Sequence, residues 1–298
     1  MPLLPRTLRH ARHTLHGLSR RVRTLLALVV GLSLATTGLA ACGSSDASSS
    51  GHTIRIGIKF DQPGLGLKDG SRFTGFDVDM GREIAKRLGY SEDEITFIEA
   101  VSAQRETMLQ NGQVDMVIGT YSITDARREK ITFAGPYYES GQTVLVKADN
   151  SKITGVKSLT SGVKVAVQAN STSVQAVTEH APDAEQVQFE TDSDCVAAVE
   201  AGQVDAYVLD EAVLLATVAS NDKVKLVGKP FTTEPYGIGL PKDSDGQAFV
   251  NAFLAKIDED GTWAKVWNNT IGSITHGTAP EPPVIGSVEG AATATPTA

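Results

Sequence analysis

Short apolar runs alternate with amphipathic helical patterns over most of the chain, from about residue 53 onward. The runs are of strand length, and glycine, proline or polar turn residues bound them, as is typical of an α/β fold. In the helical patterns apolar residues recur three or four positions apart, as Met80, Ile84 and Leu88 do. The sequence predicts strands at 53–58, 94–99, 114–118, 141–147, 162–168, 186–189, 205–209, 224–227 and 236–240, and helices at 77–88, 103–112, 193–201, 211–220 and 247–260.

Polar residues stand where several of these helices begin. Asp77 or Asp79 is expected to cap one helix and Ser102 another. The two aspartates could also suggest a metal site, but a helix N-terminus that favours carboxylates explains them more simply. Residues 170–173, with the sequence NSTS, open a further helix, which predicts a helix start suited to an anion.

One pattern occurs twice. Residues 109–119 (LQNGQVDMVIG) and 199–210 (VEAGQVDAYVLD) each run from a helix end through Gly-Gln-Val-Asp into an apolar strand. The copies are too far apart for a solenoid repeat, so we interpret them as equivalent parts of two similar lobes. The first strand ends at Thr120 and Ser122, and the second ends at Asp210.

The stretch 114–128, VDMVIGTYSITDARR, is predicted to carry a ligand site. An apolar strand ends at Gly119, hydroxyl side chains follow, and Arg127 stands at the start of a helix that Thr124 can cap. Ligands of open α/β sheets bind outside the carboxyl ends of the strands. A guanidinium group at this place suits a small carboxylate, which it can bind through two hydrogen bonds. An ordinary strand, loop and helix with a surface arginine is the alternative.

The first 41 residues differ from the rest of the chain. They hold six arginines and no acidic residue, and they end in an apolar run that is short for a spanning helix. We predict a secretory signal segment at 1–41, with an uncleaved membrane anchor as the alternative. The sequence Leu39-Ala40-Ala41-Cys42 resembles the bacterial lipobox, which implies cleavage before Cys42 and its acylation. Residues 42–52 are then a lipidated cysteine and a flexible tether.

The remaining chain is acidic and lacks a recognisable catalytic set. Without the first 41 residues it has 21 basic residues (27 less 6) against 35 acidic ones, a formal charge of −14. This balance argues against binding nucleic acid through charge. The other cysteine, Cys195, lies in a helical pattern and is expected to be buried. No Cys/His cluster has metal spacing, and neither a metal nor a cofactor is predicted.

Several further motifs occur in a fixed order along the chain: GFDVD (75–79), the helix-to-strand joint NGQVD (111–115), SITDARR (122–128), GPYYESG (135–141), PYGIGL (235–240) and DGTWAKVW (260–267). Together they resemble the family 3 extracytoplasmic solute-binding proteins, which supply polar amino acids to ABC importers. The match covers about 54–272. FDQPGLGL (60–67) and SAQRETMLQNG (102–112) are especially similar to the actinobacterial glutamate-binding lipoproteins of this family.

The resemblance implies a periplasmic-binding-protein type II fold, in which two α/β lobes are joined by two crossover hinge strands and enclose the ligand. The crossovers would lie near 138–143 and 233–236. Lobe 1 would comprise 53–139 and 236–277, and lobe 2 would comprise 140–235. A tail at 278–298, rich in proline, alanine and threonine, is predicted to be disordered.

The resemblance also implies a location and partners. The protein would be a monomer held through the lipid on Cys42 at the extracytoplasmic face of the cell membrane. It would bind a free amino acid and deliver it to ABC permease subunits, and it would not bind nucleic acid.

Roles for individual residues follow from the same resemblance. Arg127 would pair with the ligand α-carboxylate, and Asp210 would bind the α-ammonium group. Two departures concern the side-chain end of the site: Lys59 follows the first strand, where relatives often have an acidic or neutral residue, and Ser102, with Arg105 one turn on, replaces an aromatic residue. The residues that would help Arg127 are Thr120, Ser122, Ser171 and Thr172.

The charges decide the predicted ligand. Arg127 and Asp210 satisfy the zwitterion of an amino acid, and Lys59 and Arg105 add positive charge at its side-chain end. A neutral ligand would leave these cations buried and unpaired, at a cost of about a few kcal/mol. We therefore predict glutamate first and aspartate second. If Lys59 and Arg105 are solvated, glutamine or another polar amino acid is the alternative.

Two other classes of protein remain as alternatives. The fold implied by the resemblance also carries some dehydratases, so turnover of arogenate or prephenate would indicate an enzyme. The chain has no Ser/His/Asp or Cys/His set, and we predict that it is not an enzyme. The third class is a sensor ectodomain or a lobe fused to a larger hydrolase.

Overall fold

A computed structural model describes residues 53–288, all of which belong to one compact unit of the chain. The predicted signal segment, Cys42 and the tether up to residue 52 lie outside the described residues, as do residues 289–298. Between residues 53 and 288, no helix has the length and apolar character that crossing a membrane would require. The described strands form two five-stranded sheets and one three-stranded sheet.

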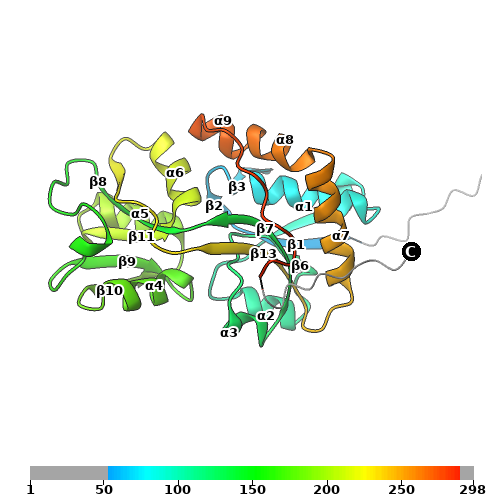
Figure 1. Cartoon of the computed structure of the whole chain (residues 1–298), viewed down its shortest axis with the longest axis horizontal. Coiled ribbons are helices and arrows are strands. Elements are labelled where there is room, and N and C mark those ends of the chain that lie inside the picture. Colours follow the sequence, from blue (N-terminus) through cyan, green and yellow to red (C-terminus); the bar gives the residue numbers. More distant parts are fainter. Residues whose placement is uncertain (1–52, 289–298) are drawn as a thin grey trace, which may run out of the picture. The chain divides into compact units, whose positions relative to one another are not determined.

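The first sheet has the strand order β5–β1–β6–β13–β7 (Figure 1). Strands β5, β1 and β6 are parallel, whereas β13 runs antiparallel to both β6 and β7. Its strands are β1 Ile54–Ile58, β5 Ile95–Glu99, β6 Met116–Val117, β7 Thr132–Ser140 and β13 Glu234–Leu240. The helices of this part are α1 Phe76–Arg87, α2 Arg105–Gln110, α3 Asp125–Arg128, α7 Gly246–Glu259, α8 Thr262–Asn269 and α9 Ile271–Thr275.

The second sheet has the order β10–β9–β11–β8–β12, in which β10, β9 and β11 are parallel. Strand β8 runs antiparallel to both of its neighbours. Its strands are β8 Gln142–Lys147, β9 Lys164–Gln168, β10 Glu185–Phe189, β11 Ala206–Asp210 and β12 Val224–Val227. The helices of this part are α4 Thr172–His180, α5 Asp192–Glu200 and α6 Glu211–Ser220, with a 3₁₀ turn, η2, at Val156–Ser158.

The repeated Gly-Gln-Val-Asp pattern leads into equivalent strands of the two sheets. Strand β6 is the central strand of the first sheet, and β11 is the central strand of the second. Gly112 and Gly202 have φ angles of 62° and 68°, a left-handed conformation that glycine adopts without cost and that ends a helix. The interpretation of the repeat as matching parts of two lobes is confirmed.

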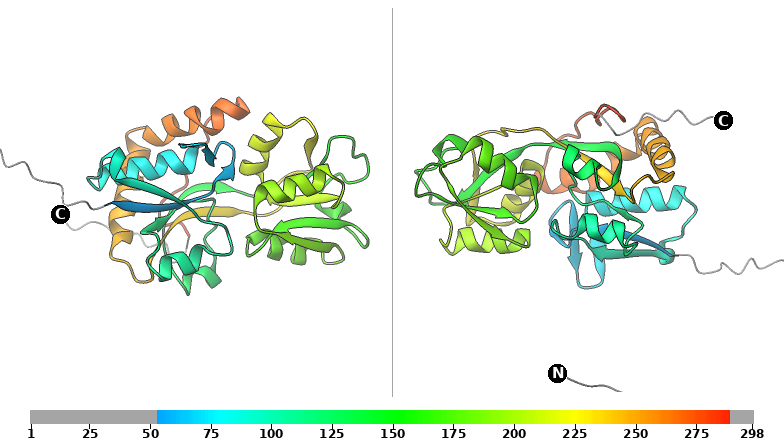
Figure 2. Two further views of the ribbon diagram at one scale, coloured as in Figure 1. Left: turned by 180° about the vertical axis from the view of Figure 1, so that it is seen from behind. Right: turned by 90° about the horizontal axis from the view of Figure 1, so that it is seen from below.

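The chain passes between the sheets twice (Figures 1 and 2). It leaves the first sheet at Gly141, between β7 and β8, and returns through 228–233, between β12 and β13. A Cβ atom on Gly141 would lie 2.4 Å from the carbonyl oxygen of Thr232, so the two crossovers touch and only glycine fits. We call the parts built on the first and second sheets lobe 1 and lobe 2. Their residue boundaries stay a prediction.

The motif at 260–267 is explained by the core of lobe 1. Trp263 is 1% exposed, and its indole N–H donates to the Tyr137 carbonyl oxygen at 2.7 Å. Its ring meets the ring of Phe76 edge to face, with centroids 5.5 Å apart. The side chain therefore ties α8 to both α1 and β7, the strand that leads to the first crossover.

Two predicted helix caps are wrong. Helix α1 begins after Gly75, which has a φ of 122°, and neither aspartate of its first turn caps it. Helix α2 begins after Gln104, so Ser102 is not its cap. In both cases the polar side chain forms a hydrogen bond with a residue distant in sequence, which a local pattern does not reveal.

Two further segments differ from the sequence-based expectation. The turn-rich stretch after β1 forms a small antiparallel sheet, followed after α1 by a 3₁₀ turn. The end of the described chain has no helix or strand after α9, yet Gly286 N–H donates to the Gly135 carbonyl oxygen at 2.8 Å and Ile285 packs on the core. This part of the predicted tail is therefore held against lobe 1. The small sheet comprises β2 Asp61–Gln62, β3 Gly66–Asp69 and β4 Arg72–Thr74, and the turn is η1 Glu92–Glu94.

Candidate functional site

The carboxyl ends of parallel strands from both lobes face each other. Lys59 follows β1 in lobe 1, and Gln168 ends β9 in lobe 2. The Lys59 ammonium group donates to the Gln168 side-chain oxygen at 3.2 Å, which joins the two strand ends directly. The lobes are therefore in contact at the edge where ligands of open α/β sheets bind.

Lys59 and Ser102 belong to one buried network. Both side chains are 2% exposed, and the Lys59 ammonium group donates to the Ser102 hydroxyl at 2.8 Å. That hydroxyl in turn donates to Gln168 at 2.8 Å. Burial, followed by the nearby charge of Arg105, lowers the pKa of Lys59 to about 8. The partners of this cation within hydrogen-bond distance are uncharged.

Arg105, at the start of α2, is a second buried cation. It is 2% exposed, its guanidinium group lies 4.0 Å from the centroid of the Tyr121 ring, and it donates to the Gly119 carbonyl oxygen at 2.9 Å. Burial, followed by the charge of Arg127, lowers its pKa to about 10. Among residues 53–288, its Nε–H has no hydrogen-bond partner.

Arg127 lies where the sequence predicts, in the short helix α3. Thr124 caps this helix, and its hydroxyl oxygen accepts the Arg127 N–H at 3.3 Å. The guanidinium group donates to the Ser122 carbonyl oxygen at 2.8 Å and to the Asn170 carbonyl oxygen of lobe 2 at 3.1 Å. The Glu106 carboxylate lies 3.5 Å from its Nε. Arg127 is therefore held by both lobes.

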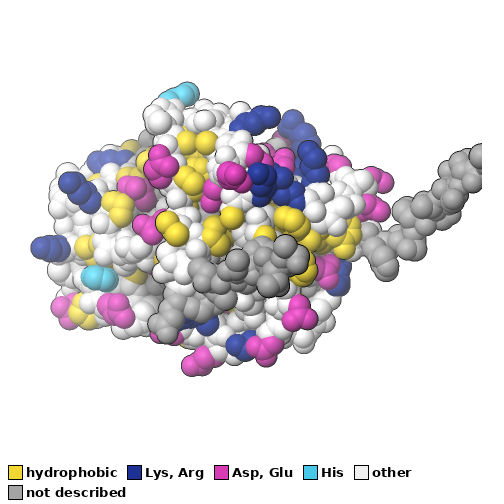
Figure 3. All heavy atoms as spheres, turned by 45° about the vertical axis from the view of Figure 1, so that its right-hand side comes forward, with side chains coloured by type: hydrophobic (Ala, Val, Ile, Leu, Met, Phe, Trp, Pro, Cys, Tyr) yellow, Lys and Arg dark blue, Asp and Glu magenta, His cyan; other side chains and the backbone are white. Residues whose placement is uncertain are grey.

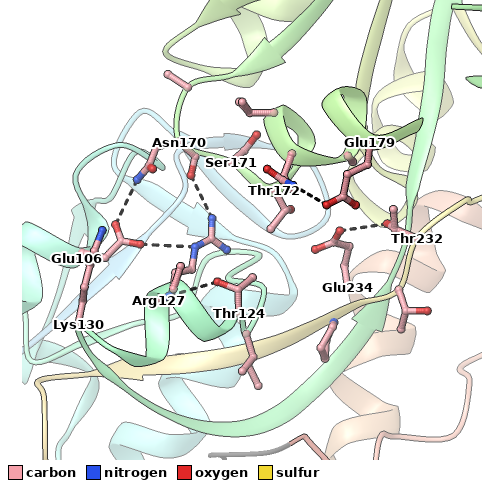
Figure 4. A pocket seen from close by; sticks show the side chains of 18 of the residues that line it. Glu106, Thr124, Arg127, Lys130, Asn170, Ser171, Thr172, Glu179, Thr232 and Glu234 are labelled. Atoms are coloured by element: carbon pink, nitrogen blue, oxygen red, sulfur yellow. Dashed lines mark hydrogen bonds and ion pairs between the residues drawn. The ribbon is translucent and has the colours of Figure 1, made fainter. Parts of the chain in front are cut away.

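A cavity of about 900 Å³ opens beside Arg127 (Figure 4). Arg127 lies beside the Asn170 backbone at one end of it, and Thr232 and Glu234 lie at the other. Ser171 and Thr172 line the lobe 2 side. Helix α4 begins at Thr172, so its first N–H groups have no helical partner, as predicted for an anion-ready helix start.

Asp210, at the end of β11, is buried in lobe 2. Its carboxylate accepts the hydroxyl of Tyr236 at 2.7 Å and the side-chain N–H of Gln142 at 2.6 Å. Burial, followed by the charge of Glu234, raises its pKa to about 8, while the charge of Arg127 lowers it. Gln142 also donates to the Thr172 hydroxyl at 3.2 Å. A short chain of contacts thus joins Asp210 to the cavity that Arg127 lines.

Thr120 and Ser122 lie in the loop between β6 and α3, close to the two site arginines. Their polar atoms bind protein groups, whereas the resemblance implies contacts with the ligand α-carboxylate. Thr120 N–H donates to Asp77 at 2.9 Å, and its hydroxyl donates to Gln62 at 3.2 Å. The Ser122 carbonyl oxygen accepts from Arg127. The N–H and hydroxyl of Thr120 therefore have protein partners rather than being free for a carboxylate.

A second contact between the lobes was not predicted. Gln62, in β2, donates to Asp192 in the first turn of α5, and the other carboxylate oxygen of Asp192 accepts from Tyr207. Asp61 accepts both the backbone N–H and the hydroxyl of Ser193, at 3.0 and 3.1 Å. We call these two pairs the β2–α5 contact.

The charged groups of the site differ from those of the surface. On the face shown in Figure 3, basic and acidic side chains lie beside one another in contact with solvent. Lys59, Arg105, Arg127 and Asp210 are instead 2–7% exposed. In the interior such charges interact more strongly, and each needs a compensating group.

Two α/β lobes joined by two crossovers, with a buried cation and a buried acid at their seam, define a two-lobe binding protein of the periplasmic type. The chain belongs to the bacterial extracellular solute-binding proteins, family 3, whose model matches residues 54–272. This match confirms the family that the sequence motifs resemble.

Similar proteins agree with this assignment. The glutamate-binding protein GluB of Corynebacterium glutamicum is 34% identical over 273 residues, which cover 85% of this chain and 92% of that protein. The glutamine-binding protein GlnH of an ABC transporter in Bacillus subtilis is 38% identical over 221 residues, covering 73% and 81%. Both relatives are named as binding proteins, and this chain is a solute-binding protein rather than an enzyme.

A solved structure supports the fold in the same way. An ancestral arginine-binding protein bound to arginine has 36% sequence identity to this chain and a TM-score of 0.68, and the likeness covers 74% of this chain and 98% of that one. The predicted two-lobe fold is thus confirmed.

Proposed function

We propose that this protein captures an acidic amino acid, L-glutamate first and L-aspartate second, between its two lobes and delivers it to an ABC importer. The relatives that bind glutamate and glutamine support a free amino acid as the ligand class. The observation that carries the choice of an acidic ligand is the pair of buried cations, Lys59 and Arg105. Within the described part of the chain, neither forms an ion pair with a carboxylate.

The two ends of the amino-acid backbone have candidate partners on opposite lobes. Arg127 would bind the α-carboxylate together with the first N–H groups of α4 and the hydroxyls of Ser171 and Thr172. Ser171 supports this role, because its hydroxyl oxygen is buried and has no partner among residues 53–288. Asp210, which already accepts two hydrogen bonds, would bind the α-ammonium group.

Ligand binding by closure follows from this arrangement. Each half of the site belongs to a different lobe, so a ligand that touches both favours the state in which the lobes are in contact. Micromolar affinity requires about −8 kcal/mol. A few charge-assisted hydrogen bonds at about 1.5–3 kcal/mol each are enough to supply it after ordering costs.

Glutamine is the second candidate, and specific groups favour it. Two buried carboxyl groups, Asp77 and Asp192, interact electrostatically with Lys59. Burial raises the pKa of each carboxyl group to about 6. If they remain ionised, they offset part of the positive charge at the side-chain end. A neutral amide could then bind, with the Gln168 amide and the Ser102 hydroxyl as partners.

Lys59→Met separates the two ligands. We expect the affinity for L-glutamate to fall roughly 10–100-fold, because one charge-assisted hydrogen bond is lost, while the affinity for L-glutamine changes much less. The measurement is titration calorimetry of the purified protein, after a thermal-shift screen against the twenty amino acids. The ratio of the two affinities is the readout, because the lost bond from Lys59 to Gln168 affects both ligands alike.

The matched control is Lys86→Met, which removes an exposed lysine of α1 in the same lobe. It should leave both affinities unchanged. A wild-type protein that prefers glutamine to glutamate, or a Lys59→Met variant with an unchanged ratio, would contradict the acidic ligand and favour glutamine.

We also propose that a lipid on Cys42 anchors the protein to the extracytoplasmic face of the cell membrane, as the lipobox resemblance implies. Cys42→Ser should move the protein from the membrane fraction to the medium or the soluble extracytoplasmic fraction, because the acyl chains supply the attachment. Cys195→Ala, which changes the buried cysteine of α5, is the control and should stay with the membrane. Retention of the Cys42→Ser protein, or an N-terminal peptide without acyl mass in the wild type, would contradict this anchor.

A further inference from the structure

We propose that Asp77 is a positioning residue that holds Thr120 in a left-handed backbone conformation and so fixes the loop 119–122 of the ligand site. The inference rests on the proposed function, because it concerns the same site. Asp77 lies outside the set of groups expected to touch the ligand.

Thr120 has a backbone conformation that its side chain disfavours. Its φ angle is 45°, in the left-handed region, where a β-branched residue is rare. Such a residue keeps this conformation only when surrounding groups hold it. Two groups do so here: the Asp77 carboxylate accepts its N–H at 2.9 Å, and the Gln62 side-chain oxygen accepts its hydroxyl at 3.2 Å.

Asp77 is itself held rigidly. It is fully buried in the first turn of α1, and its second carboxylate oxygen accepts the Tyr137 hydroxyl at 2.6 Å. Its own N–H donates to the Leu65 carbonyl oxygen at 3.0 Å. The backbone of Asp77 is held by α1 and by the turn before β3, and its carboxylate is held by Tyr137 of β7. The carboxylate therefore offers Thr120 a fixed acceptor.

The loop that Asp77 holds anchors both arginines of the site. One guanidinium nitrogen of Arg105 lies 2.9 Å from the Gly119 carbonyl oxygen and 3.4 Å from that of Thr120. The Arg127 guanidinium donates to the Ser122 carbonyl oxygen at 2.8 Å. If Thr120 leaves the left-handed conformation, these carbonyl groups turn: Arg105 loses its backbone acceptors, and Arg127 loses that of Ser122 and keeps that of Asn170.

A double-mutant cycle tests this role, because glycine adopts positive φ without help. Asp77→Ala should weaken binding of L-glutamate about tenfold, which corresponds to about 1.4 kcal/mol. In the background of Thr120→Gly, the same change should weaken it by less than about threefold, because glycine needs no acceptor to hold its φ. The affinities are measured by titration calorimetry, with L-glutamine as a second probe.

The control is Asp79→Ala, the other aspartate in the first turn of α1. Its carboxylate pairs with Arg82 at 2.8 Å, on the same helix. Asp79→Ala removes an equal charge from the same helix end and should leave the affinity unchanged. A purely structural role for Asp77 would give the same loss of affinity in the wild-type and Thr120→Gly backgrounds, and that result would overturn the inference.

Hydrogen exchange supplies a readout that needs no ligand. In the ligand-free wild type the amide of Thr120 should be protected, and Asp77→Ala should speed its exchange about tenfold, in line with the left-handed penalty. Unchanged exchange would overturn the inference. If the Ala variant does not fold, Asp77→Leu, which is of similar size and has no acceptor for the Thr120 N–H, replaces it in the same two backgrounds, with the same threefold limit deciding. Failure of the proposed function is visible separately, as a wild type that binds neither amino acid.

Discussion

Arg127→Ala is expected to weaken the binding of L-glutamate by about 3–5 kcal/mol, because the α-carboxylate is then enclosed without its cation. The change also removes the cation paired with Glu106 and the donor to the Ser122 and Asn170 carbonyl oxygens. Arg127→Lys keeps the charge but not the planar fork, so we expect an intermediate loss. Titration calorimetry gives both values.

The neighbouring residue supplies the control. Arg128 lies in the same short helix and pairs with Asp125 on that helix, outside the cavity. Arg128→Ala should leave the affinity unchanged, and thermal unfolding of the ligand-free proteins shows whether any loss in Arg127→Ala is one of folding. A loss smaller than about tenfold in a folded Arg127→Ala protein would remove this arginine from the site.

Asp210→Asn should have two opposite effects. Binding should weaken by about 2–4 kcal/mol, because the α-ammonium group loses a charged acceptor. The ligand-free protein should become more stable at pH 7. The pKa of Asp210 is about 8 in the folded protein, above its ordinary value of 3.8, so burial penalises the ionised form. The asparagine carries no such penalty.

The pH dependence follows from the sign of this shift. A raised carboxyl pKa destabilises the folded state increasingly as pH rises from about 4 to about 8, and the cost is absent below the unfolded value. The difference in unfolding temperature between Asp210→Asn and the wild type should therefore grow over this interval. Asp205→Asn, at the exposed start of the same strand region, is the control. An equal difference at pH 4 and pH 8 would contradict the buried, costly carboxylate.

The sequence predicted best what depends on local pattern. Ligands of open α/β sheets bind at strand ends, and short apolar runs located the ends of β1 and β11, where Lys59 and Asp210 lie. The cap of α3 by Thr124 was also local and is confirmed. The repeated joint before β6 and β11 predicted that the two lobes are alike, because glycine at a helix end is a backbone requirement.

What the sequence missed depends on contacts between distant segments. Gln142 and Tyr236, which hold Asp210, lie in β8 and β13, next to the two crossovers, and their role appears only when the strands are paired. Gln168 ends a predicted strand, so the strand-end rule alone could have found it. Strand β7 is absent from the predicted strands, and Pro136 lies within it, a residue that normally argues against a strand with neighbours on both sides. Here β7 lies at the edge of its sheet.

The caps expected at Asp77 and Ser102 failed for one reason. Both side chains satisfy a local rule, and both are used instead for bonds across the fold, to Thr120 and to Gln168. A local rule therefore fails where a polar side chain forms its hydrogen bond with a distant segment.

The β2–α5 contact has a consequence for the ligand specificity of such a protein. Asp61 and Gln62 join the lobes through side chains that belong wholly to the protein. The free energy that these bonds contribute to the state with the lobes in contact is the same for every ligand, because no ligand atom takes part in them. It raises all affinities in common, so under the proposed function the discrimination between ligands is left to Lys59, Arg105 and the groups around them.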